Sequence, residues 1–221
     1  MTSGDEVGMR TIGVPVVHAV TNDEVVVRED FIDVACAVMQ VLGQRGALHL
    51  RAGRLAAARF QALAEGLAAA QALTGGWLVV NDRVDVALST GARGVQLTSR
   101  SLTAVDARRI APDMAIGASV HDLDEGRAAA AAGADWLVAG HVFATATHPG
   151  APARGVSWVH SLVRATTVPV IAIGGVRTDH AAELRRVGVH GVAVIRGIWD
   201  APNAERAASD YLSAYDDAGV T

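Results

Sequence analysis

Residues 133–140 read Gly-Ala-Asp-Trp-Leu-Val-Ala-Gly, a short apolar run that begins and ends at glycine. Gly91-Ala92 and Gly188-Val189 occupy the same kind of position, between a stretch with helical periodicity and an apolar run. Glycine after a helix is typical of a left-handed C-cap, so each of these pairs marks a change from helix to strand. Apolar runs separated by helices predict parallel strands that are joined by right-handed crossovers.

The same unit recurs along the whole chain. Strands are predicted at 14–21, 47–51, 77–81, 94–97, 115–120, 134–140, 168–174 and 191–196. Helices are predicted at 31–42, 55–73, 84–90, 104–110, 123–132, 157–165, 180–187 and 204–215, with Asp122 able to cap one of them. The expected fold class is therefore α/β, a single (β/α)8 TIM barrel, with a doubly wound open sheet as the alternative. We expect residues 1–12 to be a flexible N-terminal tail and residues 13–221 to be the TIM-barrel domain.

Composition limits the partners of this chain. It has 221 residues, a net charge of −4 and 19 basic residues, all of them arginine. The absence of lysine excludes a Schiff-base mechanism, and the scattered arginines do not predict a nucleic-acid surface. The single cysteine, Cys36, excludes an internal disulfide. Since no uninterrupted apolar stretch reaches about 18 residues, we expect a cytoplasmic protein without membrane contacts.

His141 follows the apolar run that ends at Gly140. Functional residues of TIM barrels lie at the carboxyl ends of the strands, and histidine changes its charge near neutral pH. The position therefore suits a general acid or base. A histidine that only hydrogen-bonds a loop carbonyl is equally consistent with the pattern.

Other polar residues follow the remaining strands. Gly174-Gly175 and Ile195-Arg196 end the seventh and eighth strands, where backbone amides commonly bind phosphate, although the two glycines also suit a simple tight turn. Arg51 suits a carboxylate or phosphate, or else an ion pair with a loop carboxylate. Asp82 suits a Mg²⁺ ligand, a helix cap or a partner of Arg83.

Several motifs in order, between residues 16 and 215, resemble the thiamine phosphate synthase superfamily. They are Val17-His18-Ala19-Val20-Thr21-Asn22-Asp23, His49-Leu50-Arg51, Asn81-Asp82-Arg83-Val84-Asp85-Val86-Ala87-Leu88, Gly117-Ala118-Ser119-Val120-His121, Gly133-Ala134-Asp135-Trp136 and Ile171-Ala172-Ile173-Gly174-Gly175. The resemblance implies one of two activities in thiamine biosynthesis. Synthases join a pyrimidine diphosphate to a thiazole phosphate, and thiazole tautomerases (the TenI-like branch) aromatise the carboxythiazole ethyl phosphate.

The chain departs from the synthase pattern in three loops. It has Arg51-Ala52-Gly53 where synthases have Arg-Glu-Lys, and residues 98–101 (Thr-Ser-Arg-Ser) where they have Gly-Gln-Glu-Asp with a Mg²⁺-binding carboxylate. His148 stands in place of their loop lysine. Residues 140–143 (Gly-His-Val-Phe) resemble the tautomerases, where synthases have Gly-Pro. The expected function is therefore an isomerase, a thiazole tautomerase that transfers a proton within its substrate.

The resemblance also implies a set of site residues. His141 would carry the proton, Arg51 would hold the carboxylate, and the other substrate-binding residues are Asn81, Ser119, Thr145, Thr147, Gly174, Gly175, Ile195 and Arg196. The expected partner is a small-molecule thiazole phosphate, with no metal and no organic cofactor, in a homo-oligomer. The alternatives are a synthase with atypical diphosphate recognition and a non-catalytic, regulatory thiazole-phosphate binder. The roles of His121 and His148 stay open.

Overall fold

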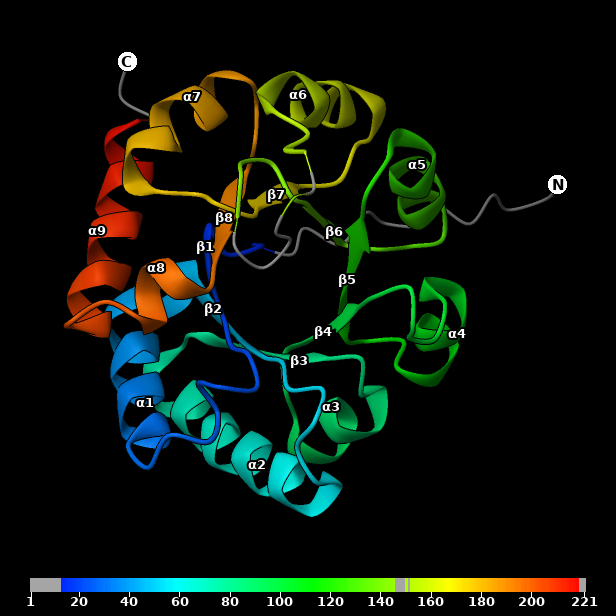
Figure 1. Ribbon diagram of the computed structural model, residues 1–221. Coiled ribbons are helices and arrows are strands. Elements are labelled where there is room, and N and C mark those ends of the chain that lie inside the picture. The colour runs from blue at the N-terminus through cyan, green and yellow to red at the C-terminus, as the bar shows by residue number, and fades with distance from the viewer. Residues whose placement is uncertain (1–12, 146–149, 151, 219–221) are drawn as a thin grey trace, which may run out of the picture.

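The computed structural model describes residues 13–145, 150 and 152–218 and shows a closed barrel (Figure 1). Every strand pairs in parallel with the next one along the chain, and β8 pairs with β1. The strands are β1 (Val17–Val20), β2 (Gly46–Leu50), β3 (Trp77–Asn81), β4 (Gly94–Leu97), β5 (Ala115–Val120), β6 (Trp136–Ala139), β7 (Val170–Ile173) and β8 (Gly191–Val194). The predicted single TIM barrel is confirmed, and the open sheet is excluded.

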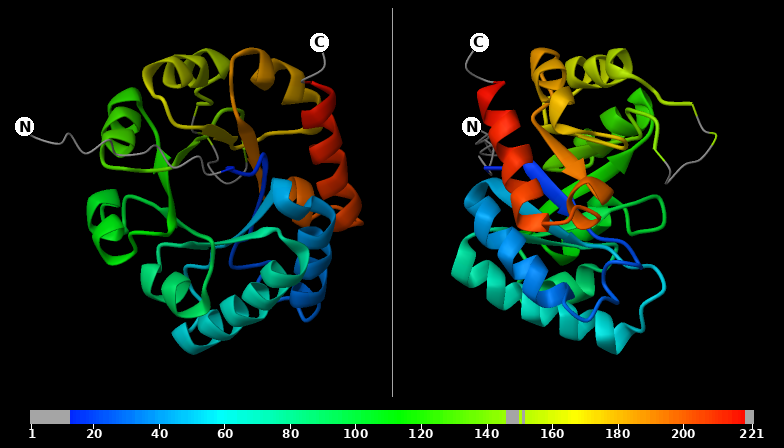
Figure 2. Two further views of the ribbon diagram at one scale, coloured as in Figure 1. Left: turned by 180° about the vertical axis from the view of Figure 1, so that it is seen from behind. Right: turned by 60° about the vertical axis from the view of Figure 1, so that its left-hand side comes forward.

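Helices surround the ring of strands in both face views (Figures 1 and 2). They are α1 (Phe31–Leu42), α2 (Ala57–Thr74), α3 (Val84–Thr90), α4 (Ala104–Ile110), α5 (Leu123–Ala131), α6 (Val156–Ala165), α7 (Ala181–Arg186), α8 (Arg196–Trp199) and α9 (Ala204–Asp217), with short 3-10 turns at Gly43–Arg45 and Thr178–His180. The sequence did not predict α8, because a helix of 4 residues is too short to show periodicity.

The glycines and the capping aspartate that the sequence predicted lie at the ends of helices. Gly91 after α3 and Gly133 after α5 have φ angles of 70° and 88°, a region that glycine enters without steric cost. The Asp122 side chain caps α5 by accepting a hydrogen bond from the Glu125 amide. These capping residues define where a helix begins or ends, and the chain then continues into the next strand of the barrel.

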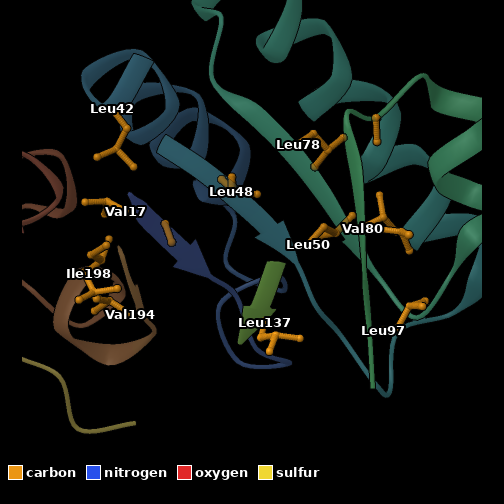
Figure 3. Packing of buried hydrophobic residues seen from close by; sticks show 14 of the residues in the cluster. Val17, Leu42, Leu48, Leu50, Leu78, Val80, Leu97, Leu137, Val194 and Ile198 are labelled. Carbon is orange, nitrogen blue, oxygen red and sulfur yellow. The ribbon is translucent and has the colours of Figure 1, made fainter. Parts of the chain in front are cut away.

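The strands pack on both faces because alternate residues point in opposite directions. Leu48 and Leu50 of β2 and Leu78 and Val80 of β3 belong to the cluster between strands and helices (Figure 3). A second cluster fills the inside of the barrel and contains Ala47, Trp77, Val79, Trp136, Val138 and Ile171. The polar residues that share the inward register are therefore enclosed by the barrel.

The mouth of the barrel is the side where the strands end. The connections after β2 and β6 leave the barrel on this same side (Figure 2). The expected N-terminal tail, residues 1–12, lies outside the described residues. Within the described ranges, no helix is both long enough and apolar enough to cross a membrane.

Candidate functional site

A cavity of about 1000 Å³ opens at the mouth. Its lining includes the predicted site residues Arg51, Asn81, Ser119, His141, Thr145, Gly174, Gly175, Ile195 and Arg196. Thr147 and His148 lie outside the described residues. A second hollow of about 980 Å³ includes residues that precede β7 and β8, at the opposite end of the barrel. The barrel thus brings the described predicted residues together in one place.

The segment after β6 forms one wall of the cavity and is held against the end of β7. The Val142 amide donates to the Ile173 carbonyl and the Phe143 amide to the Gly174 carbonyl, both at 2.9 Å. Gly174 has a φ of 96°, and a Cβ atom there would lie 2.3 Å from the His141 Cβ. Only glycine allows this close approach, so Gly174 determines where His141 lies.

Arg51 is held at the mouth through its backbone. The buried Thr21 hydroxyl donates to the Arg51 carbonyl and accepts from the Arg51 amide, both at 2.9 Å. The nearby loop carboxylate, Asp23, pairs with Arg54 at 3.5 Å. Among the ion pairs of the described residues, none involves Arg51. The predicted alternative of an ion pair at Arg51 is therefore wrong for this part of the chain.

Two buried histidines lie below the cavity. His18 Nδ1 is 2.8 Å from His49 Nε2, and His18 Nε2 is 2.9 Å from the Pro15 carbonyl oxygen. Because a carbonyl only accepts, we assign the His18 proton to Nε2 and infer that His49 donates to His18 Nδ1. Burial lowers the pKa of His18 to about 4 and holds the pKa of His49 well below its usual value. The pair is therefore neutral near neutral pH.

His49 lines the cavity, but it was not among the predicted site residues. The signal was present in the strand pattern, because His49 lies between Leu48 and Leu50, which point outward. His18 alternates with Val17 and Ala19 in the same way. A polar residue at an inward position of a barrel strand needs a partner inside the protein, and each of these histidines is the other's partner.

Gln96 connects the inner layer to the cavity. Its Oε1 accepts from Trp136 Nε1 at 2.9 Å, and its Nε2 donates to Ser119 Oγ at 3.0 Å. A Cβ atom at position 117 would lie 2.2 Å from Trp136 Cε2 and 2.4 Å from Gln96 Oε1, so Gly117 leaves the space for this bond. The layer formed by His18, His49, Gln96 and Trp136, called the inner polar layer below, is thus hydrogen-bonded within the protein.

Asp82 has neither of the two structural roles predicted for it. The residue before α3 is Arg83, which pairs with Asp85 at 2.6 Å. Asp82 Oδ1 instead accepts hydrogen bonds from Thr98 Oγ1, at 2.6 Å, and from Ser101 Oγ. These bonds tie the β4–α4 loop to the end of β3.

The described residues of the site offer few ligands to a Mg²⁺ ion. Protein-bound Mg²⁺ is usually held by one or two carboxylates together with substrate phosphates. Asp82 Oδ1 is occupied by the two hydroxyl groups, and the only described carboxylate lining the cavity, Asp200, pairs with Arg28 at 3.1 Å. Across the described residues, no group of three or more His, Cys, Asp or Glu side chains could hold a metal ion.

The mouth is strongly basic. Among the described residues, five arginines and one aspartate line the cavity, so five positive charges less one negative charge leave a formal +4. The arginines are Arg51, Arg100, Arg154, Arg177 and Arg196, of which Arg100, Arg154 and Arg177 were not predicted as site residues. Arg177 pairs with Asp179 at 2.6 Å, whereas Arg154 lies 5.2 Å from the Trp158 ring centroid. The cavity suits an anionic ligand.

The comparisons with known proteins agree on one family. The family model described as thiamine monophosphate synthase matches residues 17–198. A thiamine-phosphate synthase from Pyrococcus furiosus is 42% identical over 131 residues, which cover 59% of this chain and only 63% of that protein. One from Roseiflexus castenholzii is 34% identical over 194 residues, which cover 87% of this chain and 84% of that protein. A solved thiamine phosphate pyrophosphorylase from Pyrococcus furiosus has a TM-score of 0.80 at 29% identity, covering 92% of this chain and 96% of that one.

These matches correct the expected activity. The expectation of an isomerase, a thiazole tautomerase, is wrong, because curated relatives between 38% and 42% identical are named thiamine-phosphate synthases, which are transferases. The expectation depended on residues 140–143 and on the missing lysines and carboxylate, which indicated a loss of diphosphate binding. Arg100 and Arg154 line the same mouth, so the missing lysines do not leave it without positive charge.

Proposed function

We propose that this chain, which belongs to the thiamine monophosphate synthase family, is itself a thiamine-phosphate synthase. Its substrates would be small molecules, a pyrimidine diphosphate and a thiazole phosphate. The observation that carries the proposal is the cavity with a formal charge of +4, because the two substrates together bring several negative charges to one site. The names of the relatives support the same transferase chemistry.

The proposed reaction exchanges one bond for another. The thiazole nitrogen forms a C–N bond with the methylene carbon of the pyrimidine, and the C–O bond to the diphosphate breaks. The electron pair of that bond leaves with pyrophosphate, so negative charge develops on the leaving group. Arginines that are already in place stabilise such charge without having to reorganise, which lowers the barrier.

The thiazole phosphate would be bound at the ends of β7 and β8. We assign its oxygens to the backbone amides of Gly174, Gly175, Ile195 and Arg196. In support of this, the loop and turn hydrogen bonds of the described residues include none donated by the amide of Gly174 or Gly175. The Arg196 guanidinium lies 3.4 Å from Thr145 Oγ1, which brings two more donors to the rim of this site. Thr147 stays a proposed contact outside the described residues.

The heterocycles would rest on the floor of the cavity. Asn81 Oδ1 is buried without a hydrogen-bond partner among the described residues, and an unsatisfied buried acceptor is costly. An amino group on the heterocycle that donates to Asn81 Oδ1 would remove this cost. Ser119 accepts from Gln96, so its own hydroxyl proton is available to a ring acceptor. Both contacts favour a heterocycle with donors and acceptors on its edge.

His141 takes a different role from the one expected for a tautomerase. Joining the two rings requires no proton transfer at carbon, so the reaction does not need His141 as a base. We assign it to direct contact with the bound substrate, since it lines the cavity and Gly174 sets its position. Arg51 would bind the diphosphate instead of a carboxylate.

A coupling assay tests the proposed function. The purified chain is incubated with both substrates, with and without Mg²⁺, and thiamine phosphate and pyrophosphate are quantified by chromatography. We expect the two products in equal amounts. Gly174→Ala should abolish the reaction, because the added methyl group would collide with His141, whereas Arg206→Gln on α9 should leave it unchanged. If the unaltered chain makes no product under either condition, the proposed function is wrong.

A further inference from the structure

The β4–α4 loop differs from the family pattern in charge as well as in sequence. Residues 98–101 read Thr-Ser-Arg-Ser, where the synthases that the chain resembles carry two acidic residues. Arg100 is exposed and lines the cavity. Its guanidinium makes no ion pair with a described carboxylate. The loop that carries acidic residues in those synthases therefore carries a positive charge in this chain.

Asp82 is the carboxylate beside this loop, and its hydrogen bonds hold the loop in place. Asp82 Oδ1 accepts from Thr98 and Ser101, the two hydroxyl groups on either side of Arg100 in the sequence. The Ser101 hydroxyl also accepts from the Thr98 amide at 2.9 Å, which closes the turn. Asp82 thus holds the loop that carries Arg100, and a cation bound to Oδ1 would have to displace both hydroxyl groups.

The cations of the mouth match the chemistry of a diphosphate. A guanidinium group has five N–H donors in a plane and binds phosphate oxygens in pairs. Arg51 and Arg100 follow β2 and β4, the two strands on either side of β3, and line the same cavity as Arg154. None of these three has a carboxylate partner among the described residues. Their positive charge is therefore not neutralised within the described protein.

We propose that Arg51, Arg100 and Arg154 bind the substrate diphosphate directly, without a divalent cation between the protein and the phosphates. The inference depends on the proposed function only for the identity of the ligand. Arg100 then takes over the charge neutralisation that a carboxylate-bound metal would provide. The chain has no lysine, and arginines supply the basic charge among the described residues that line the mouth.

Calorimetric titration with inorganic pyrophosphate tests the inference on the intact chain. The titration is carried out in a buffer with a chelator and repeated with excess Mg²⁺. We expect binding in the chelator and no gain in affinity on adding Mg²⁺, which itself complexes pyrophosphate in solution. Arg100→Gln should weaken binding about tenfold or more, because it removes charge-assisted hydrogen bonds from an exposed side chain. Arg206→Gln on α9, which changes the net charge equally at a side chain that does not line the cavity, should change the affinity less than twofold.

The outcomes separate this inference from the proposed function. Binding of pyrophosphate only when Mg²⁺ is present overturns the inference, and so does an unchanged affinity in Arg100→Gln. If the coupling assay forms product only when Mg²⁺ is present, the inference is also overturned, but the proposed function stands. Conversely, pyrophosphate binding in the chelator without any product refutes the proposed function and leaves the arginine site in place.

Discussion

The inner polar layer and the mouth lie in the same barrel, but their polar groups are satisfied in different ways. In the layer, hydrogen bonds of 2.8 to 3.0 Å join His18 to His49 and Gln96 to Trp136 and Ser119. At the mouth, Arg51 and Arg100 form no ion pair with a described carboxylate. Buried polar groups need protein partners because water cannot reach them, whereas exposed cations stay hydrated until an anion binds. The layer is therefore satisfied within the protein, whereas the mouth keeps cations that suit an anionic ligand.

The largest expected effect is on the inner polar layer. Gly117→Ala places a methyl group 2.2 Å from Trp136 Cε2 and 2.4 Å from Gln96 Oε1, so we expect the free energy of unfolding to fall by about 3 kcal/mol or more. Urea denaturation measures the loss. Gly13→Ala, at a position with nothing within 4 Å, is the control and should change little. A Gly117→Ala variant as stable as the unaltered chain would show that the layer can be repacked.

The next effect is an acid dependence of stability. Because burial lowers the pKa of His18 from 6.5 to about 4, protons bind the unfolded chain more tightly. The contribution of His18 is complete above pH 6.5 and is lost as the pH falls to 4. At 1.36 kcal/mol per pH unit this amounts to about 3 kcal/mol. The free energy of unfolding, measured against pH, should fall more steeply in the unaltered chain than in His18→Gln.

His160 provides a matched control for this measurement. It is exposed on α6, so His160→Gln should keep the pH dependence of the unaltered chain. Identical slopes for His18→Gln and the unaltered chain between pH 6.5 and 4 would contradict the assignment of a neutral, buried His18.

A smaller effect, on binding alone, is expected at the mouth. Arg51→Gln removes a half-buried cation and should weaken pyrophosphate binding about tenfold, which corresponds to about 1.4 kcal/mol. The free energy of unfolding should change by less than about 0.5 kcal/mol, since Thr21 holds the Arg51 backbone rather than its side chain. Titration calorimetry and urea denaturation measure the two quantities. A large loss of stability would mean that Arg51 belongs to the structural part of the barrel.

The smallest effect is expected at Ser119, where the two regions meet. Ser119→Ala removes the acceptor of the Gln96 Nε2–H bond, and we expect a loss of about 1 kcal/mol in stability. The same change should raise the KM for the heterocyclic substrate a few fold. Steady-state kinetics beside urea denaturation separates the two effects. A change in stability with unchanged kinetics would place Ser119 entirely in the inner polar layer.

Much of the fold could be predicted from local pattern. The predictions for β3, β4, β5, α1, α3 and α4 agree with the structure residue for residue. Apolar periodicity defines these elements, and glycines such as Gly91 and Gly133 end the helices between them. Strand ends such as 14–16 and 195–196 were predicted too long, because residue type along the chain does not show whether the backbone pairs with a neighbouring strand.

The candidate site could be predicted only in part. Arg51, Asn81 and Ser119 were predicted because they stand at the ends of strands. Arg100 and Arg154 were not, since they lie in loops whose path has no periodic signature. The substitutions in the β4–α4 loop indicated a lost diphosphate site, and only the shared cavity shows that the loop brings an arginine to the mouth.

The amino-acid sequence by itself determined the eight strand–helix units, the absence of lysine and the residues at the ends of the strands. These properties depend on spacing and residue type, which are local. Only the tertiary structure decided that His18 meets His49, that Asp82 holds the loop of Arg100, and that arginines from distant loops line one cavity. Closing the barrel brings strands far apart in the chain within hydrogen-bonding distance, and such contacts depend on three-dimensional position rather than on local pattern.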